Sequence, residues 1–307
     1  MTDATLSLAT FNRPKGLERL LRALLTQDVG DYNIVVLIID NACDAATREM
    51  VSELSKSSEY LGQYVEEPQR GIVAARNKAV EVFLNSDSQN LAFIDDDEWP
   101  RDDNWIMSLL VGMDKHNADI VTGPVIAVNF SGVPNWVTSV IHDFGKHSPG
   151  ERVKYFYTNN LLVSRRVLEK MRPAFDNRFA MIGGSDYHFA IRCLAAGFRA
   201  IYIDAPVMEE IPASRATVNW FALRGFRSGI GYTRAHLIEE GVLKGGFRSI
   251  FMAGIRLARG GALLVAGLAT LSKARLVNGM FRVGSCVGTI AGLFGASYRE
   301  YLAVHGE

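Results

Sequence analysis

Short β-rich runs alternate with helical patterns from Ala4 to about Ile203. In order, they read TLSLATF, a helix from Pro14, NIVVLIID, a helix after Asp44, QYVEEP, a helix after Gly71, and LAFIDDD. This alternation predicts parallel strands joined by crossover helices, which is an α/β fold. The run IVVLII is apolar at every position, as expected of a central strand that is covered on both faces.

Composition narrows the class of protein. The 307 residues are 48% hydrophobic and can fill a sizeable core. Lys and Arg equal Asp and Glu at 33 each, so the overall charge does not indicate a nucleic-acid partner. The three cysteines follow neither a zinc pattern nor a disulfide framework, and the N-terminus lacks the apolar core of a signal peptide. We therefore expect a cytoplasmic protein.

Polar residues follow three of the predicted strands at their carboxyl ends. They are Thr10 to Arg13, then Asp40 and Asn41, then Asp95 to Asp97. In an open α/β sheet, ligands bind beyond the carboxyl ends of the strands, where loops carry the chemistry. We expect these three loops to converge on one edge of the sheet.

The acidic stretch LAFIDDDEWP places carboxylates directly behind an apolar run. Asp95 and Asp97, two residues apart at a strand end, can turn towards one ligand. Magnesium and manganese prefer such oxygen donors and complete their shells with water and phosphate oxygens. The alternative is a solvated acidic turn ahead of the helix that is expected near Asp102.

Two further stretches combine glycine with charged residues. In QRGIVAARNKAV, Gly71 permits a tight loop into a helix whose N-terminal amides, together with Arg76, suit a phosphate group. In GGSDYHFAIR, Asp186 stands in the first turn of a helix. It is either a general base or a carboxylate that complements the helix dipole. No GxGxxG or GxxxxGK[ST] motif follows the first strand, which counts against a dehydrogenase or a P-loop enzyme.

Taken in order, these stretches resemble family 2 glycosyltransferases of the GT-A fold, particularly bacterial enzymes of exopolysaccharide synthesis similar to the succinoglycan glucosyltransferases. The resemblance covers roughly residues 4 to 235 and rests on ATFNRP, IIDNA, GIVAARN, LAFIDDDE, GGSDYHFAIR and EEIPASRATVNWFALRGFRSG. It implies a Rossmann-like, mostly parallel mixed sheet flanked by helices. It divides that region into a nucleotide-sugar half, 1–128, and an acceptor half, 129–235.

The resemblance also implies a role for each matching residue. Asp40 corresponds to the residue that reads the nucleobase, usually uracil, Asp97 to the direct ligand of Mn²⁺ or Mg²⁺, and Asp186 to the catalytic base. Asp95 corresponds to a ribose or metal contact. The UDP-sugar donor would contact Thr10, Phe11, Arg13, Asp40, Asn41, Gly71, Arg76, Asp95 and Asp96.

The sequence departs from the family pattern at three positions. Ser185 stands where glutamate is usual, and His188 where aspartate is common, which makes the surroundings of Asp186 less negative. Met208 stands where some members carry a metal-binding histidine. Glu209 is then the nearest candidate for a third metal contact.

The composition changes after about residue 235. Thirteen of the 28 glycines fall between Gly241 and Glu307, where eight basic residues face two acidic ones. The longest uncharged runs, Gly260 to Ser272 and Val283 to Tyr298, have 13 and 16 residues, whereas a spanning helix needs about 20. We expect 236–307 to be a helical appendage that lies on an anionic membrane surface. The alternative is a helical hairpin packed on the rest of the chain or on a second subunit of a homo-oligomer.

The resemblance implies an inverting hexosyltransferase, and the basic C-terminal region predicts that it is peripheral on the inner face of the cell membrane. It would move a hexose from a UDP-sugar to a polyprenyl-diphosphate-linked or other saccharide acceptor. One alternative is a nucleotidyltransferase that makes sugar nucleotides, although ATFNRPKG lacks the glycine run that such enzymes carry after their first strand. The other alternative is an inactive nucleotide-binding scaffold at the membrane.

Overall fold

The structure is a computed structural model that describes residues 2–56, 62–128, 133–141, 147–180 and 182–297. Its strands are β1 (Ala4–Thr10), β2 (Ile34–Asp40), β3 (Gln63–Glu66), β4 (Asn90–Asp95), β5 (Glu98–Pro100), β6 (Ile120–Thr122), β7 (Val125–Val128), β8 (Asn160–Ser164), β9 (Ala200–Tyr202) and β10 (Val207–Glu210). Its helices are α1 (Pro14–Leu25), α2 (Ala45–Ser55), α3 (Ile72–Leu84), α4 (Trp105–His116), α5 (Thr138–Ile141), α6 (Arg165–Lys170), α7 (Ser185–Ala195), α8 (Val218–Ala269) and α9 (Lys273–Leu293), with short 3₁₀ turns at Asn177–Phe179 and Ala213–Arg215.

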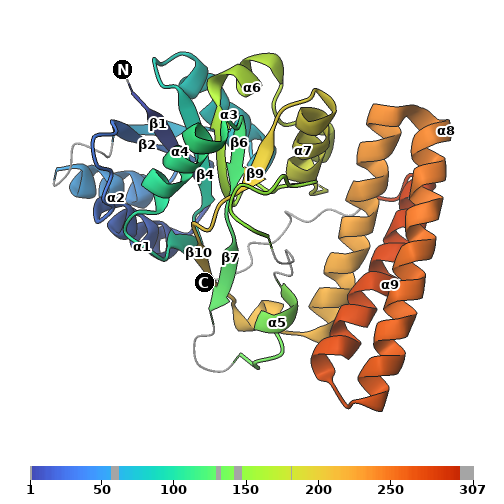
Figure 1. The fold of residues 1–307 in the computed structure, drawn as a ribbon. Helices are drawn as coiled ribbons and strands as arrows, with labels where there is room; N and C mark the ends of the chain where they lie inside the picture. The colour runs from blue at the N-terminus through green and yellow to red at the C-terminus, as the bar shows by residue number, and fades with distance from the viewer. Residues whose placement is uncertain (1, 57–61, 129–132, 142–146, 181, 298–307) are drawn as a thin grey trace. The chain divides into compact units, whose positions relative to one another are not determined.

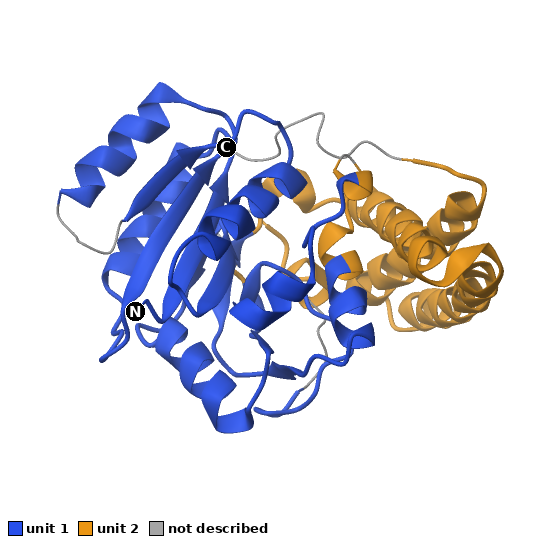
Figure 2. Ribbon diagram, turned by 90° about the horizontal axis from the view of Figure 1, so that it is seen from above, with its two compact units in different colours: residues 1–126, 144–177, 189–210 blue, residues 127–143, 178–188, 211–307 orange. Residues whose placement is uncertain are grey.

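The described residues form two compact units, shown in different colours in Figure 2. Unit 1 comprises 1–126, 144–177 and 189–210, and unit 2 comprises 127–143, 178–188 and 211–307. The last ten residues of the predicted appendage, 298–307, lie outside the described part of the chain.

Unit 1 contains a seven-stranded sheet in the order β3-β2-β1-β4-β8-β6-β9 (Figure 1). The strands β3, β2, β1 and β4 are parallel neighbours, as predicted, and β6 pairs in parallel with β9. Strand β8 runs antiparallel to both β4 and β6. The sheet is therefore mixed and mostly parallel, and a small second sheet follows the order β5-β10-β7.

A hydrophobic core covers one face of the large sheet. The predicted stripe of α1 is buried, because Leu17, Leu20 and Leu21 are fully inaccessible to solvent. The same core contains Val51 of α2 and Trp105 of α4, packed on alternate residues of the strands. Because side chains alternate across a strand, only one of its two faces enters this core. Helix α3 packs against β1, β2 and α6 instead.

Unit 2 is dominated by α8 and α9, which pack closely side by side (Figure 1). A Cβ atom added at Gly288 would lie 1.9 Å from the carbonyl oxygen of Phe226, and one at Gly225 would lie 2.1 Å from that of Phe281. Glycine therefore allows the two backbones to touch. Helix α8 is interrupted at Gly241, whose φ of 78° lies in the left-handed region that glycine tolerates.

Candidate active site

The loop after β1 meets the acidic turn after β4. The strands are parallel neighbours, with Ala9 opposite Asp95, so their carboxyl ends lie together. Thr10 Oγ1 donates a hydrogen bond to Asp96 Oδ2 over 2.9 Å. Arg13 Nη1 donates to Asp96 Oδ1 over 3.0 Å and to Asp97 Oδ2 over 2.8 Å. The predicted convergence of these two loops is confirmed.

Asp96 is the most buried of the three consecutive aspartates. Its side chain lies beneath Thr10 and Arg13, and the residue is 5% exposed. Burial raises the pKa of this carboxyl to about 7, even though the Arg13 guanidinium lowers it. Asp97 adds a further negative charge beside it. A bound cation would favour the ionised form of the carboxyl groups in this turn.

A second carboxylate pair stands next to the turn and comes from the small sheet. Glu98 of β5 lies directly opposite Glu209 of β10, and they are 2% and 7% exposed. Glu98 Oε1 accepts a hydrogen bond from Asn159 Nδ2 over 3.0 Å, whereas its buried Oε2 has no hydrogen-bond partner in the part of the chain that the structure describes. Burial, followed by the charges of Asp95 and Glu209, raises the pKa of Glu98 well above its usual value.

Glu98 was not predicted as a site residue. It stands in the quoted acidic run, but its burial depends on the pairing of a three-residue strand with a strand more than one hundred positions away. The available signal was the four consecutive acidic residues, and it did not distinguish which of them would be buried.

Among the residues that the structure describes, no three His, Cys, Asp or Glu side chains gather closely enough to enclose a metal ion. Asp95 Oδ1 accepts from Arg76 over 2.9 Å, and Asp97 is paired with Arg13. The donor set therefore fits a cation that is held by one or two carboxylates and completed by water and phosphate oxygens. Beside these paired aspartates, Glu98 Oε2 is a buried oxygen without a hydrogen-bond partner among the described residues.

Asp40 is fully buried at the end of β2. Its Oδ1 accepts from the backbone N–H of Ala42, and its Oδ2 accepts from the N–H of Asp44, each over 2.8 Å. The hydroxyl of Tyr64 also donates to Oδ2 over 2.6 Å. The carboxylate thus shapes the loop that joins β2 to α2. Tyr64 was missed because its contact crosses to the neighbouring strand.

Asn41 connects the second loop to the third. Its Nδ2 donates to the carbonyl oxygens of Glu67 and Gln69, and its Oδ1 accepts from the N–H of Gly71 over 2.7 Å. Gly71 has a φ of 126°, which a residue with a Cβ rarely adopts. The predicted tight loop into α3 is confirmed.

Two other predicted donor residues lie at the same edge of unit 1. Arg76 is on α3, is 8% exposed, and directs its guanidinium at Asp95. It is therefore a buried counter-charge rather than a solvated side chain. The Phe11 ring lies 4.7 Å from the guanidinium of Arg70, which gives that aromatic face a cationic neighbour.

Asp186 belongs to unit 2, where it stands in the first turn of α7. The turn before it uses positive φ angles of 74° at Gly183 and 87° at Gly184. Asp186 Oδ1 accepts from the N–H of Tyr187 over 2.8 Å. A Cβ added at Gly231 of α8 would lie 3.5 Å from the carbonyl oxygen of Gly183, so this turn packs directly on α8.

His188 stands where the resembling family commonly has aspartate, and it is paired with another residue of unit 2. His188 is 1% exposed, its ring stacks on Phe179 at 4.7 Å, and its Nε2 lies 2.7 Å from Glu239 Oε1. Glu239 of α8 thus places a carboxylate next to His188, where the family pattern has an aspartate. The partnership joins residues 51 positions apart and carries no local sequence signal.

Relatives of known class match most of the chain. The model of glycosyl transferase family 2 matches residues 6–172. The succinoglycan biosynthesis protein ExoM of Rhizobium meliloti (strain 1021) is 31% identical over 298 residues, which are 94% of this chain and 92% of ExoM. The glycosyltransferase AglE of Haloferax volcanii is 28% identical over 193 residues, which are 62% of this chain and 61% of AglE.

Solved structures share the fold. The mannosyltransferase PcManGT of Pyrobaculum calidifontis, in complex with GDP-Man and Mn²⁺, superposes with a TM-score of 0.64 at 17% identity, over 95% of this chain and 87% of that one. A fragment of S. aureus TarS in complex with UDP superposes with a TM-score of 0.53 at 15% identity, over 97% and 93%. These likenesses confirm the predicted GT-A fold. From its match over residues 6–172 and its likeness to ExoM along nearly the whole length, this chain belongs to glycosyl transferase family 2.

Proposed function

We propose that this chain is an inverting, metal-dependent hexosyltransferase that uses a UDP-sugar donor in the synthesis of a cell-surface polysaccharide. The observation that carries the proposal is the acidic turn at the carboxyl ends of β1 and β4, held by Thr10, Arg13 and Arg76. Family membership favours sugar transfer over nucleotidyl transfer. The likeness to ExoM, a succinoglycan biosynthesis protein, supports the polysaccharide product.

On this proposal, the carboxylates of unit 1 hold the donor through a divalent cation. Asp97 and Asp95 would bind Mn²⁺ or Mg²⁺, with Glu209 as a third candidate beside Glu98. When bound, the cation supplies Lewis-acid stabilisation of the departing diphosphate. Arg13 and Arg76 already lie within 3 Å of these carboxylates, so cation and diphosphate binding would redistribute the existing ion pairs.

Asp186 is proposed to take the proton from the acceptor hydroxyl. As that oxygen bonds to the anomeric carbon, the bond from this carbon to the diphosphate oxygen breaks, and the proton passes to the carboxylate. A single in-line displacement inverts the anomeric configuration. The close packing of the Gly183–Gly184 turn on α8 supports a fixed position for this base.

Calorimetric titration tests the donor half of this proposal without an acceptor. The protein would be titrated with UDP, GDP and dTDP, first with Mn²⁺ and then with chelator. We expect UDP to bind only with the cation, and GDP and dTDP to bind at least ten-fold more weakly. Binding of GDP alone would replace the UDP-sugar by a GDP-sugar. Absence of nucleotide binding would leave the acidic turn with only its internal hydrogen bonds and ion pairs and remove the proposal's main support.

The C-terminal helices of unit 2 are long and apolar enough to cross a membrane by length and composition. The best 18-residue windows of α8 and α9 have mean hydropathies of 1.4 and 1.3, and only 17% and 33% of these windows is buried. A core helix of a soluble protein would be mostly buried. The exposed apolar surface on these helices therefore favours contact with a partner or a membrane.

Seven of the eight large apolar residues that are exposed on α8 after Gly241 gather on one face, here called the apolar strip. It consists of Leu243, Phe247, Ile250, Phe251, Leu257, Val265 and Leu268, which are 54% to 91% exposed. Leu243, Phe247, Ile250 and Phe251 have the spacing i, i+4, i+7 and i+8 of a single helix face. Over these 26 residues the strip is roughly 39 Å long.

The other face of this segment of α8 is buried against the rest of unit 2. It consists of Gly245, Ser249, Ala253, Gly260 and Gly267. The segment contains Lys244, Arg248, Arg256 and Arg259 but no acidic residue from Leu243 to Leu268. Each arginine in the middle of a spanning helix would cost roughly 2.5 to 3.5 kcal/mol. We therefore propose that the segment lies in the plane of an anionic leaflet, at the inner face of the cell membrane.

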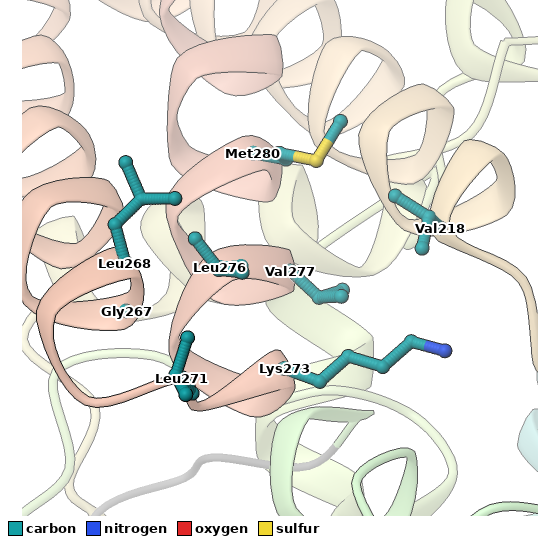
Figure 3. Close-up of a pocket in the computed structure, with 8 residues that line it drawn as sticks. All are labelled: Val218, Gly267, Leu268, Leu271, Lys273, Leu276, Val277 and Met280. Carbon is teal, nitrogen blue, oxygen red and sulfur yellow. The ribbon is translucent and has the colours of Figure 1, made fainter.

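The turn between α8 and α9 continues this apolar surface. A pocket at the turn is lined by Val218, Gly267, Leu268, Leu271, Lys273, Leu276, Val277 and Met280 (Figure 3). Leu271 is 90% exposed, and the Lys273 side chain extends away from Leu268 and Leu271. Attachment of the chain to a membrane would suit an acceptor saccharide that is carried on a polyprenyl diphosphate.

Charges placed on the apolar strip should abolish membrane binding. We expect Phe247→Glu combined with Phe251→Glu to reduce co-sedimentation with vesicles of phosphatidylcholine and phosphatidylglycerol at least ten-fold, because two aromatic side chains no longer enter the lipid. The matched control is Val111→Glu, which changes an exposed apolar residue on α4 of unit 1 and should bind vesicles normally. If the double variant instead converts a dimer into a monomer and leaves vesicle binding intact, the strip is a subunit interface.

A further inference from the structure

The turn that carries Asp186 is connected to the middle of α8 by two side chains that follow it. The Tyr187 hydroxyl lies 2.9 Å from His236 Nε2, and His188 Nε2 lies 2.7 Å from Glu239 Oε1. All these residues belong to unit 2. Both partners stand on α8, within five residues of the kink at Gly241. The link is therefore formed where this helix changes direction.

The connection through Tyr187 continues across the kink. His236 Nδ1 lies 3.1 Å from Glu240 Oε1, and Arg248 Nε donates to Glu240 Oε2 over 2.9 Å. Glu240 precedes Gly241, whereas Arg248 lies two turns beyond it. A Cβ added at Gly245 would lie 2.4 Å from the carbonyl oxygen of His236, so the two sides of the kink also touch through their backbones.

Aromatic packing keeps this row of side chains in place. The His236 ring lies 4.5 Å from that of Tyr232, which in turn lies 5.7 Å from the Tyr187 ring. The guanidinium of Arg256 covers Tyr232 at 4.4 Å and donates to Thr289 of α9. The side chain of His236 is 7% exposed and that of Glu240 is 16% exposed. Hydrogen bonds at such depth are stronger than on the surface and strongly constrain geometry.

We propose that Tyr187, His236, Glu240 and Arg248 form a positioning chain that holds the turn bearing Asp186 against α8 in its working geometry. The catalytic part of this inference rests on the proposed role of Asp186 as the base. Asp186 is the immediate neighbour of Tyr187 and accepts that residue's backbone N–H. A loosened Tyr187 would therefore move the carboxylate, and displacements of about 1 Å in a reacting group can cost on the order of 100-fold in rate.

Two variants break the positioning chain at opposite ends. Arg248→Gln removes the cation that fixes Glu240, and Tyr187→Phe removes only a hydroxyl from the first link. The matched control is Arg275→Gln, which loses one positive charge from an exposed arginine at the hairpin turn whose guanidinium contacts Thr270. Deuterium exchange of the amides from Gly183 to Phe189 measures how firmly the turn is held. Turnover is measured as UDP release from a panel of UDP-hexoses with Mn²⁺.

We expect exchange in the turn to be at least five-fold faster in both chain variants and unchanged in the control, while all three keep the melting temperature of the unaltered protein within a few degrees. We also expect kcat to fall about ten-fold with the donor KM changed less than two-fold, because the turn positions the base and not the nucleotide. Arg248→Lys should recover part of the loss.

Equal exchange in the control and the chain variants would overturn the positioning chain, whatever the turnover shows. Faster exchange with an unchanged kcat would overturn its role in catalysis. An equal loss of kcat in Arg275→Gln would assign the effect to net charge and overturn it as well. If exchange is faster but the unaltered protein releases UDP from no UDP-hexose, the chain still holds the turn and the proposed donor fails instead.

Discussion

Replacement of Asp186 by asparagine is expected to lower hexose transfer on the order of 1,000-fold while UDP binding stays within two-fold of the unaltered protein. Asparagine keeps the shape of the side chain and can still accept the N–H of Tyr187, but it cannot take a proton from the acceptor hydroxyl. Removal of a general base typically costs 10²- to 10⁴-fold in rate. Transfer would be followed with a radiolabelled UDP-hexose, and binding by calorimetry with Mn²⁺.

Asp114→Asn provides the matched control, because Asp114 is an exposed carboxylate on α4 of unit 1, outside the proposed site. It should transfer hexose at the unaltered rate. Undiminished transfer by Asp186→Asn would show that another group takes the proton, and Asp186 would then serve only as a carboxylate at the N-terminus of α7.

Replacement of Asp97 by asparagine is expected to abolish cation-dependent UDP binding and to reduce transfer at least 100-fold. No three His, Cys, Asp or Glu side chains gather closely among the described residues, so the change of Asp97 removes one of the few protein ligands that a cation could use here. Chelator should produce the same loss in the unaltered protein. The control is Asp103→Asn, an exposed carboxylate a few residues further along the chain.

The affinity for Mn²⁺ should also rise between pH 6 and pH 8. Burial raises the pKa of Asp96 to about 7, so this carboxyl is mostly protonated at pH 6 in the cation-free protein. A cation beside it favours release of this proton, and binding becomes easier as the pH rises through that pKa. A Mn²⁺ affinity that does not change with pH would place the cation away from this turn. Normal UDP binding by Asp97→Asn would do the same.

Local periodicity was enough to predict the main elements of unit 1. The stripe of leucines in α1 and the apolar run of β2 have the periods of a buried helix face and a buried strand, and both are buried. The convergence of Thr10 and Asp96 followed from topology, because neighbouring parallel strands present their carboxyl ends together. The antiparallel insertion of β8 between β4 and β6 had no such signal, because strand order depends on contacts between distant segments.

The sequence also changes in composition near residue 235, but the helix does not begin there. Helix α8 starts at Val218 and runs through that position, with its interruption at Gly241. The helix begins earlier because Phe221 and Gly225, which precede the glycine-rich region, are already buried within unit 2. The composition of a helix depends on which of its faces are exposed, whereas the ends of the helix are set by capping and packing.

By itself, the sequence determined the alternation of strands and helices, the loops at the carboxyl edge and the acidic turn, because these depend on residues adjacent in the chain. Only the tertiary structure decided the charge state and partners of that turn. Arg76 faces Asp95, and Glu98 lies opposite Glu209, through contacts between separate elements. The link from Tyr187 to His236 likewise joins residues 49 positions apart. Burial and electrostatic pairing arise when distant segments pack together, and no short stretch of sequence contains that information.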